Sequence, residues 1–196
     1  MFLNDTWRLY FHDPVEDVWT RESYASLGVV SSVENFWTLW NSIDEHIHKG
    51  MFFLMREHVF PVWDDASLVN GGTISCKIPF EEANDFFCKL SLRALGETLL
   101  DKSARRVPWD AINGISIAPK RFFNIAKIWV GPAGPDVVAA LRLPTIKPPP
   151  PRPGAAPIRG RQAPKPPQTT FSSFTVQIQR SHTAESLVHQ DAVEVL

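Results

Sequence analysis

The sequence contains few cysteines, no long apolar run and no apolar leader at its N-terminus. Cys76 and Cys88 are the only two cysteines in 196 residues. Two thiols in a chain this long indicate a reducing, cytoplasmic setting and not a disulfide framework, and their spacing is not that of a metal site. No window approaches 18 uninterrupted apolar residues, and no basic start precedes an apolar stretch. We therefore expect neither a membrane span nor a secretory signal.

The chain also has almost no excess charge. A formal net charge of −1 gives no bulk attraction to nucleic acid, so any such contact must be local. Apolar residues make up 44% and charged residues 21%, which is the balance of a globular domain. The length is enough for one domain with a substantial core.

Tryptophan, in contrast, is abundant, with seven residues. They are Trp7, Trp19, Trp37, Trp40, Trp63, Trp109 and Trp129. Tryptophan is rarely wholly buried, so some of these should lie at surfaces or sites. In VFPVWDDASLVNGG (59–72), Trp63 stands beside two acids. Either the indole is core and the acids are solvated, or the stretch is a recognition edge that stacks on a planar ligand and accepts its N–H groups.

Apolar periodicity predicts a mixed fold. Strands are expected over 7–11, 51–63 (one irregular strand or a pair), 73–80, 115–119, 124–130 and 174–179, and helices over 33–47, 81–100 and 136–143. Serines before residue 33 are typical of a helix N-cap. Gly96 lies inside the second predicted helix, where glycine costs about 1 kcal/mol; close packing, a docking surface or a bend would explain it. The interleaving favours an α+β fold with helices on one face of an antiparallel sheet.

A proline-rich segment interrupts the pattern near the C-terminus. Residues 144–167 hold ten of the 17 prolines, and all their charged residues are basic. This composition is typical of an extended or disordered segment. We predict a domain over 1–143, a proline-rich insertion or linker over 144–170, the last strand of the same domain within 171–182, and a flexible C-terminus over 183–196.

The order of the aromatic motifs resembles a known family. WRLYF, then Trp19, SVENFWTLWNSI, FPVWDD…NGG, DFFCKLSLRALGE and NGISIAPKRFFNIAKIW follow one another as in eukaryotic translation initiation factor 4E, from Trp7 to Trp129. Several departures make the chain similar to the divergent kinetoplastid paralogues. The resemblance implies a curved antiparallel sheet of about eight strands with about three helices on its convex face. It also implies a monomer without cofactor or metal, whose concave face binds the 7-methylguanosine cap of mRNA.

The resemblance assigns the base-binding roles to four residues. Trp19 and Trp63 match the two indoles that sandwich the cationic methylated guanine, for which tryptophan is the best ring. Asp64 takes the position of the carboxylate that accepts the guanine N1–H and N2–H donors. Asp64 is one methylene shorter than the usual glutamate, so either the loop moves closer or Asp65 shares the work. Trp129 matches the tryptophan placed against the N7-methyl group.

The same comparison of motifs assigns the phosphates to the hairpin before Trp129. Lys120 falls at the matching basic position, with Arg121 beside it. Phe122 and Ile125 stand where the family has further lysines. The phosphate contacts are therefore expected to be weaker or to come from elsewhere.

A second surface is implied on the convex side, where the family binds an amphipathic helix of a partner. The matching residues are Val33, Trp37, Leu92, Leu95 and Gly96. Lys89 replaces an acid there, which bears on partner choice. The expected partners are capped mRNA and either an initiation factor 4G-like scaffold or a 4E-binding regulatory protein. Whether the output promotes or represses translation stays open.

Two alternatives come from other classes. Asp64 and Asp65 with the pair His46 and His48 could form a metal hydrolase, although no nucleophile and base stand out. The proline segment could make the chain a scaffold ligand, which would leave the tryptophan order unexplained. The resemblance favours a binding protein with no catalytic residues.

Overall fold

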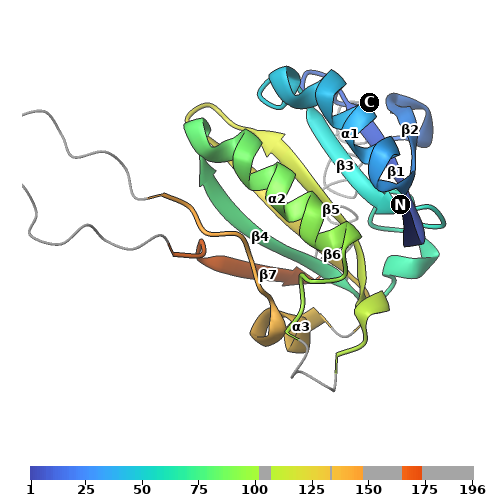
Figure 1. Cartoon of the computed structure of the whole chain (residues 1–196), viewed down its shortest axis with the longest axis vertical. Helices are drawn as coiled ribbons and strands as arrows, with labels where there is room; N and C mark the ends of the chain where they lie inside the picture. Colours follow the sequence, from blue (N-terminus) through green and yellow to red (C-terminus); the bar gives the residue numbers. More distant parts are fainter. Residues whose placement is uncertain (102–106, 133, 148–164, 174–196) are drawn as a thin grey trace, which may run out of the picture.

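The structure is built on one antiparallel sheet. This computed structural model describes residues 1–101, 107–132, 134–147 and 165–173. Its strands are β1 Phe2–His12, β2 Tyr24–Ser32, β3 Met51–Arg56, β4 Gly72–Pro79, β5 Ile112–Pro119, β6 Phe123–Val130 and β7 Thr169–Ser173, and its helices are α1 Val33–Ile43, α2 Ala83–Leu95 and α3 Gly134–Ala140. The strands lie in the order β2-β1-β3-β5-β6-β4-β7, with α1 and α2 across one face (Figure 1). The predicted α+β class is confirmed, with seven strands in the described residues against about eight expected.

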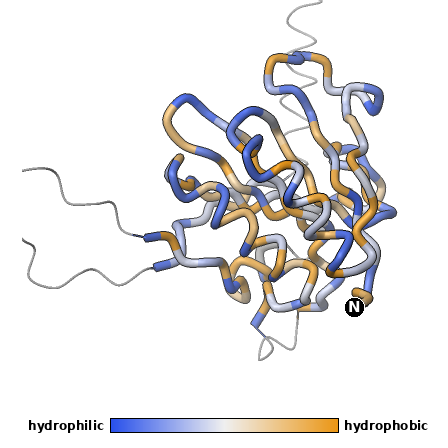
Figure 2. The backbone as a smooth tube through the Cα atoms, turned by 45° about the horizontal axis from the view of Figure 1, so that its top comes forward, coloured by the Kyte–Doolittle hydropathy of each residue, from blue (hydrophilic) through white to orange (hydrophobic). Residues whose placement is uncertain are grey.

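Period-two alternation gives the sheet two different faces. On β5, Ile115 and Ile117 are wholly buried in the larger core, which α1 and α2 cover. Ser116 between them points to the opposite face, which we call the open face. There Phe53 and Trp129 belong to a smaller apolar cluster. Figure 2 shows apolar and polar residues alternating along the backbone.

The first helix begins where its sequence predicts, but it ends at Ile43 and not at 47, because a short 3₁₀ turn follows over Asp44–His46. The Ser32 side chain accepts a hydrogen bond from the Asn35 N–H at 3.2 Å, which caps α1. Phe36 and Trp40 recur at helical spacing and are buried. Trp40 meets Phe87 of α2 at a ring-centroid distance of 6.1 Å, which joins the two helices over the sheet.

The second helix is shorter than predicted. It was expected over 81–100, but a short 3₁₀ turn precedes it and α2 ends at Leu95. Gly96 is its C-cap, and its N–H donates back into the last turn at 2.9 Å. Glu97 then takes the left-handed conformation, with φ of 52°. The expectation of a glycine inside the helix is therefore wrong, and no interior-helix penalty needs an explanation.

The hairpin expected around 120–124 is confirmed, because the N–H of Lys120 donates to the carbonyl of Phe123 at 2.8 Å between β5 and β6.

The irregular strand or strand pair expected over 51–63 is wrong beyond Arg56, where β3 ends and a loop begins. β7 pairs with β4 from Thr169 to Ser173, so it begins two residues before the boundary we expected at 171. Residues 174–196 lie outside the described residues, and with them the whole of the strand expected over 174–179; β7 ends just before it.

Three smaller observations concern the earlier expectations. Cys76 and Cys88 are both free thiols. Trp109, which no motif explained, packs at the border of the larger core, 5.8 Å from the Arg56 guanidinium. Within the described part of the chain, no helix is long and apolar enough to cross a bilayer.

Candidate functional site

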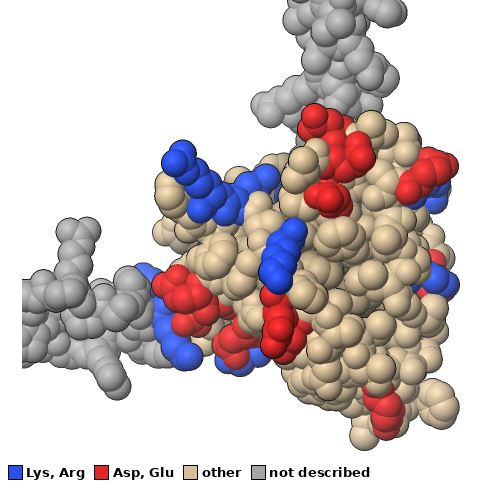
Figure 3. Space-filling view, turned by 90° about the horizontal axis from the view of Figure 1, so that it is seen from above, with Lys and Arg blue, Asp and Glu red and all other residues tan. Residues whose placement is uncertain are grey.

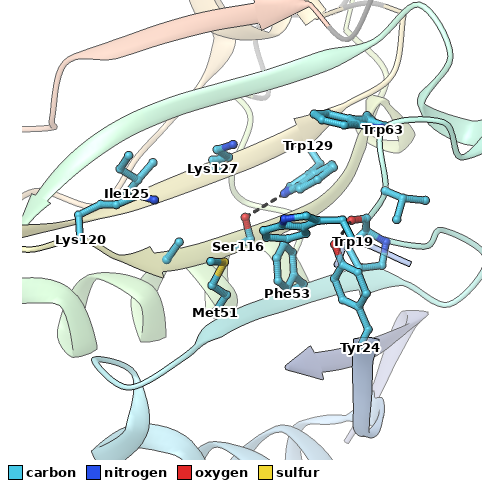
Figure 4. A pocket seen from close by; sticks show the side chains of 13 residues that line it. Trp19, Tyr24, Met51, Phe53, Trp63, Ser116, Lys120, Ile125, Lys127 and Trp129 are labelled. Atoms are coloured by element: carbon cyan, nitrogen blue, oxygen red, sulfur yellow. Dashed lines mark hydrogen bonds between the residues drawn. The ribbon is translucent and has the colours of Figure 1, made fainter. Parts of the chain in front are cut away.

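A cavity of about 320 Å³ opens on the open face of the sheet. Its walls come from the loop that carries Trp19, the loop that carries Trp63, and the strands β5 and β6. Figure 4 shows Trp19 and Trp63 on opposite sides of Trp129, with two lysines further along the sheet. Three indoles and two ammonium groups thus share one cavity.

Trp129 forms the floor of this cavity and is held in place on two sides. Its indole Nε1–H donates to the Ser116 hydroxyl at 2.9 Å (Figure 4), so its one polar atom is satisfied. The Phe53 ring meets it edge-on at 6.1 Å. Alternation along β6 puts Lys127 and Ile125 on the same face as Trp129. Lys127 is two residues from Trp129, and Ile125 is four residues from it.

Trp19 is half-exposed and is supported from behind by a histidine. The His12 ring stacks on the indole at 4.1 Å with an interplanar angle of 5°. His12 is wholly buried, and its ring nitrogens lie 2.8 Å from the Asp13 carbonyl oxygen and 3.2 Å from that of Val18. One indole face is therefore fixed, and the side chain still lines the cavity.

The two acids after Trp63 do different work. Asp65 is buried, and its carboxylate oxygens accept the N–H groups of Phe60 and Ser67, each at 3.0 Å. This carboxylate therefore holds the loop together and caps the short 3₁₀ turn that follows it. Asp64 and Trp63 are exposed. Of the two acids, Asp64 and Asp65, only Asp64 presents its carboxylate to solvent.

Two contacts tie the Trp19 loop to the Trp63 loop. The Tyr24 hydroxyl donates to the Pro61 carbonyl at 2.9 Å, and burial raises the pKa of Tyr24, which keeps it a neutral donor. The Arg21 guanidinium lies 3.7 Å from Asp65 and 4.5 Å from the centre of the Phe60 ring. These contacts fix the separation of the walls that carry the two tryptophans.

The cavity is electropositive. Lys120 and Lys127 line it, and none of the described lining residues is an aspartate or glutamate. Burial, and then the charge of Lys120, lower the pKa of Lys127. Two ammonium groups without a local counter-charge suit an anionic ligand. Together with the indoles, they suit a planar base attached to phosphates.

The structure brings together most of the site residues expected from the sequence. Trp19, Trp63, Trp129 and Lys120 line this cavity. Asp64 is exposed on the loop next to Trp63 and does not line it. Arg121 does not line it either.

The Arg121 guanidinium lies 5.0 Å from the centre of the Phe122 ring, at the tip of the hairpin. The more buried Lys127 is the basic residue that the sequence analysis did not single out. The sequence contained a feature that could have identified Lys127: it is the one charged residue in an otherwise apolar stretch, two residues before Trp129. His12 and Tyr24 gave no comparable signal.

The residues of the expected second surface lie on α1 and at the end of α2. Trp37 is 41% exposed and Leu92 40% exposed, which is unusual for large apolar side chains. Val33 is half-buried, Leu95 is buried, and Gly96 is the exposed C-cap. These residues belong to the helices that cover the sheet, away from the open face (Figure 1).

Comparison with known proteins agrees with this geometry. Residues 2–142 match the family model described as eukaryotic initiation factor 4E. The chain belongs to the eukaryotic initiation factor 4E family. A curated relative in this family, eukaryotic translation initiation factor 4E-1 of Arabidopsis thaliana, is 27% identical over 101 residues, which is 48% of this chain and 43% of that protein. The match thus spans less than half of the plant factor.

Solved structures of 4E family members share the fold. Ascaris suum eIF4E-3 in complex with an m2,2,7G cap has a TM-score of 0.60 at 18% identity, covering 70% of this chain and 78% of that one. C. elegans eIF4E-3 with the 4E-binding protein Mextli and a cap analogue has a TM-score of 0.57 at 19% identity, covering 66% and 73%. At such identities the likeness concerns the 4E fold alone.

Proposed function

We propose that this family member binds the 7-methylguanosine cap of mRNA in the cavity on the open face and acts in translation initiation or its control. The observation that carries the proposal is the joining of Trp19, Trp63 and Trp129 with two lysines in one cavity whose described lining has no acid. Relatives solved with a cap or cap analogue share the fold and support the same assignment.

In this proposal the methylated guanine stacks between Trp19 and Trp63. Methylation at N7 makes the base a cation, so indole stacking gains a cation–π contribution. Trp19 is already held by its stack on His12, and the two loops are already joined by their contacts. The site is therefore preorganised, which reduces the conformational entropy lost on binding. Asp64 accepts the N1–H and N2–H donors, and Lys127 and Lys120 meet the phosphates.

The decisive experiment is a binding titration with 7-methylguanosine triphosphate against unmethylated GTP, followed by tryptophan emission. Stacking on exposed indoles should quench the emission, and the methylated ligand should bind more tightly because it alone carries the cation. Equal affinities for the two nucleotides would refute the cap assignment and leave a general nucleotide site.

The adjacent acids Asp64 and Asp65 should separate binding from stability. Asp64→Asn should weaken cap binding by about 1–3 kcal/mol, because an amide donor then faces the donors of the base. Its melting temperature should stay unchanged, since Asp64 is exposed. Asp65→Asn should lower the melting temperature, because one loop N–H loses its acceptor. Calorimetric titration and thermal melting of both variants test this; a stable Asp64→Asn with unaltered cap affinity would remove Asp64 from the site.

A hydrolase is the rival from another class. Both carboxylate oxygens of Asp65 already hold the loop. Within the described residues, no three His, Cys, Asp or Glu side chains converge on one point. The same titration sample, incubated with Mg²⁺, discriminates the two, since a binding protein returns the cap analogue intact.

We also propose that α1 and the end of α2 dock an amphipathic helix of a scaffold or regulatory protein. The exposed Trp37 and Leu92, with Val33 and Gly96 beside them, support this surface. Relatives of the same fold are solved with a 4E-binding protein. Lys89 forms an ion pair with Asp85 at 2.6 Å, so its charge is partly compensated before a partner arrives.

The proline-rich segment fits an insertion within the domain better than a tail. α3 precedes it, and β7 follows it in the same sheet. The Ile146 N–H donates to the Lys165 carbonyl at 3.0 Å, so the chain on either side of 148–164 is held at one place. Because the entropy of loop closure grows slowly with length, the domain can carry such an insertion.

A further inference from the structure

A second cavity adjoins the first on the sheet. It has a volume of about 520 Å³ and shares Ile125 with the cavity described above. It lies where β7 begins, beside the part of β4 that extends past the last β4–β7 pair, Cys76 with Thr169. The two cavities therefore follow one another along β6 and β4.

The lining of the second cavity is basic and polar, with an apolar part. Lys77 and Lys165 line it and are exposed. Gln168 adds an amide, and Pro166 and Pro167 add two apolar rings. As in the first cavity, the described lining residues include no aspartate or glutamate.

The two lysines of this cavity are held by backbone contacts, and their side chains are exposed. Lys77 lies in β4 and pairs with Ile125 of β6. The Lys77 ammonium lies 4.9 Å from the centre of the Phe123 ring, at the base of the β5–β6 hairpin. The Lys165 carbonyl accepts the Ile146 N–H. Among the described residues, neither lysine forms an ion pair with a carboxylate.

Charge separates this region from the rest of the chain. The whole sequence has a net charge of −1, yet the two adjoining cavities hold four lysines and no acid in their described lining. In Figure 3 a group of Lys and Arg side chains protrudes with no acidic side chain among them, on the side where Figure 1 places the β5–β6 hairpin. A line of basic groups across two cavities suits an extended chain of phosphates better than a single anion.

We propose that the second cavity binds the nucleotides that follow the cap, so that one RNA chain occupies both cavities. This inference rests on the proposed cap binding, which sets the direction of the RNA. With the base at Trp129 and the triphosphate at Lys127 and Lys120, the next phosphates pass Ile125 and reach Lys77 and Lys165. The exposed Pro166 ring offers an apolar surface to a base or ribose, and the exposed Gln168 amide can donate and accept at a base edge.

The test uses the full chain with two ligands, 7-methylguanosine triphosphate and a capped tetraribonucleotide. The double variant Lys77→Gln/Lys165→Gln should bind the triphosphate like the unaltered protein. It should bind the tetranucleotide about 25-fold more weakly at 0.1 M salt, because two single-strand phosphate contacts each scale as about the −0.7 power of salt concentration relative to 1 M. The slope of log affinity against log salt should fall by about 1.4.

Lys49→Gln is the control, because it removes an exposed charge that lines neither cavity and lies outside the proposed partner surface. It should change neither ligand's affinity. Unchanged tetranucleotide affinity in the Lys77/Lys165 variant, or an equal loss for both ligands, would overturn the proposal. If the unaltered protein fails to bind the triphosphate, cap binding itself fails and this inference with it. A 4-thiouridine after the cap should crosslink to 75–77 or 165–170; crosslinks confined to other segments would also overturn it.

Discussion

Replacing Trp63 by alanine should weaken binding of 7-methylguanosine triphosphate by about 1–3 kcal/mol, the loss of one stacking partner. Trp63 is 44% exposed and lines the cavity, so its removal opens one wall without opening the core. The melting temperature should therefore stay close to that of the unaltered protein. Calorimetric titration is the appropriate measurement, since removal of an indole changes the emission itself.

Trp37 provides the control for this experiment. It is 41% exposed, almost the same as Trp63, but lies on α1, away from the open face. Trp37→Ala should leave the cap affinity unchanged and abolish binding of an amphipathic peptide helix with a tyrosine and a distal leucine. Trp63→Ala should do the reverse. If both variants lose the same ligand, the two surfaces are not independent and the assignment of one of them is wrong.

Lys127→Met should make the protein more stable and should weaken its binding of the cap triphosphate. Burial and the neighbouring Lys120 both disfavour the charged form of Lys127 and lower its pKa. A methionine fills similar space without that penalty, so the free energy of unfolding should rise by about 0.5–2 kcal/mol, as for other stabilising changes at functional sites. Denaturant unfolding and calorimetric titration measure the two effects.

The pH dependence follows from the direction of this shift. The folded state binds the Lys127 proton less tightly than the unfolded state, so the lysine destabilises the fold fully below its folded pKa. The penalty disappears as the pH rises through the folded pKa toward the ordinary value of 10.5. The advantage of Lys127→Met should therefore be full below the folded pKa of Lys127 and decline to nothing as the pH approaches 10.5. Lys120→Met, at an exposed position, should lose triphosphate affinity and gain less stability, because it relieves only the smaller cause of the Lys127 penalty; an equal gain there would contradict burial as the main cause.

Local signals predicted most elements of the fold, but not the strand β2, Tyr24–Ser32. The serine before α1, the apolar spacing of Phe36 and Trp40, and the alternation along β5 and β6 predicted the structures that form. These signals are local because capping and periodicity act within a few residues. The ends of elements were less predictable. α2 stops at Leu95, and Glu97 after it adopts a left-handed conformation. β3 stops at Arg56, where the chain turns and the Arg56 carbonyl accepts the Val59 N–H at 2.9 Å.

The sequence by itself determined the class of the fold, the order of the aromatic motifs and, through them, the family. It also placed Trp19, Trp63, Trp129 and Lys120 as candidates for one site. The tertiary structure alone decided which groups hold that site: His12 behind Trp19, Tyr24 and Arg21 across to the Trp63 loop, and Asp65 inside that loop. These contacts join residues that are far apart in sequence or separated by a turn. Their energies depend on burial and direction, which no sequence interval specifies.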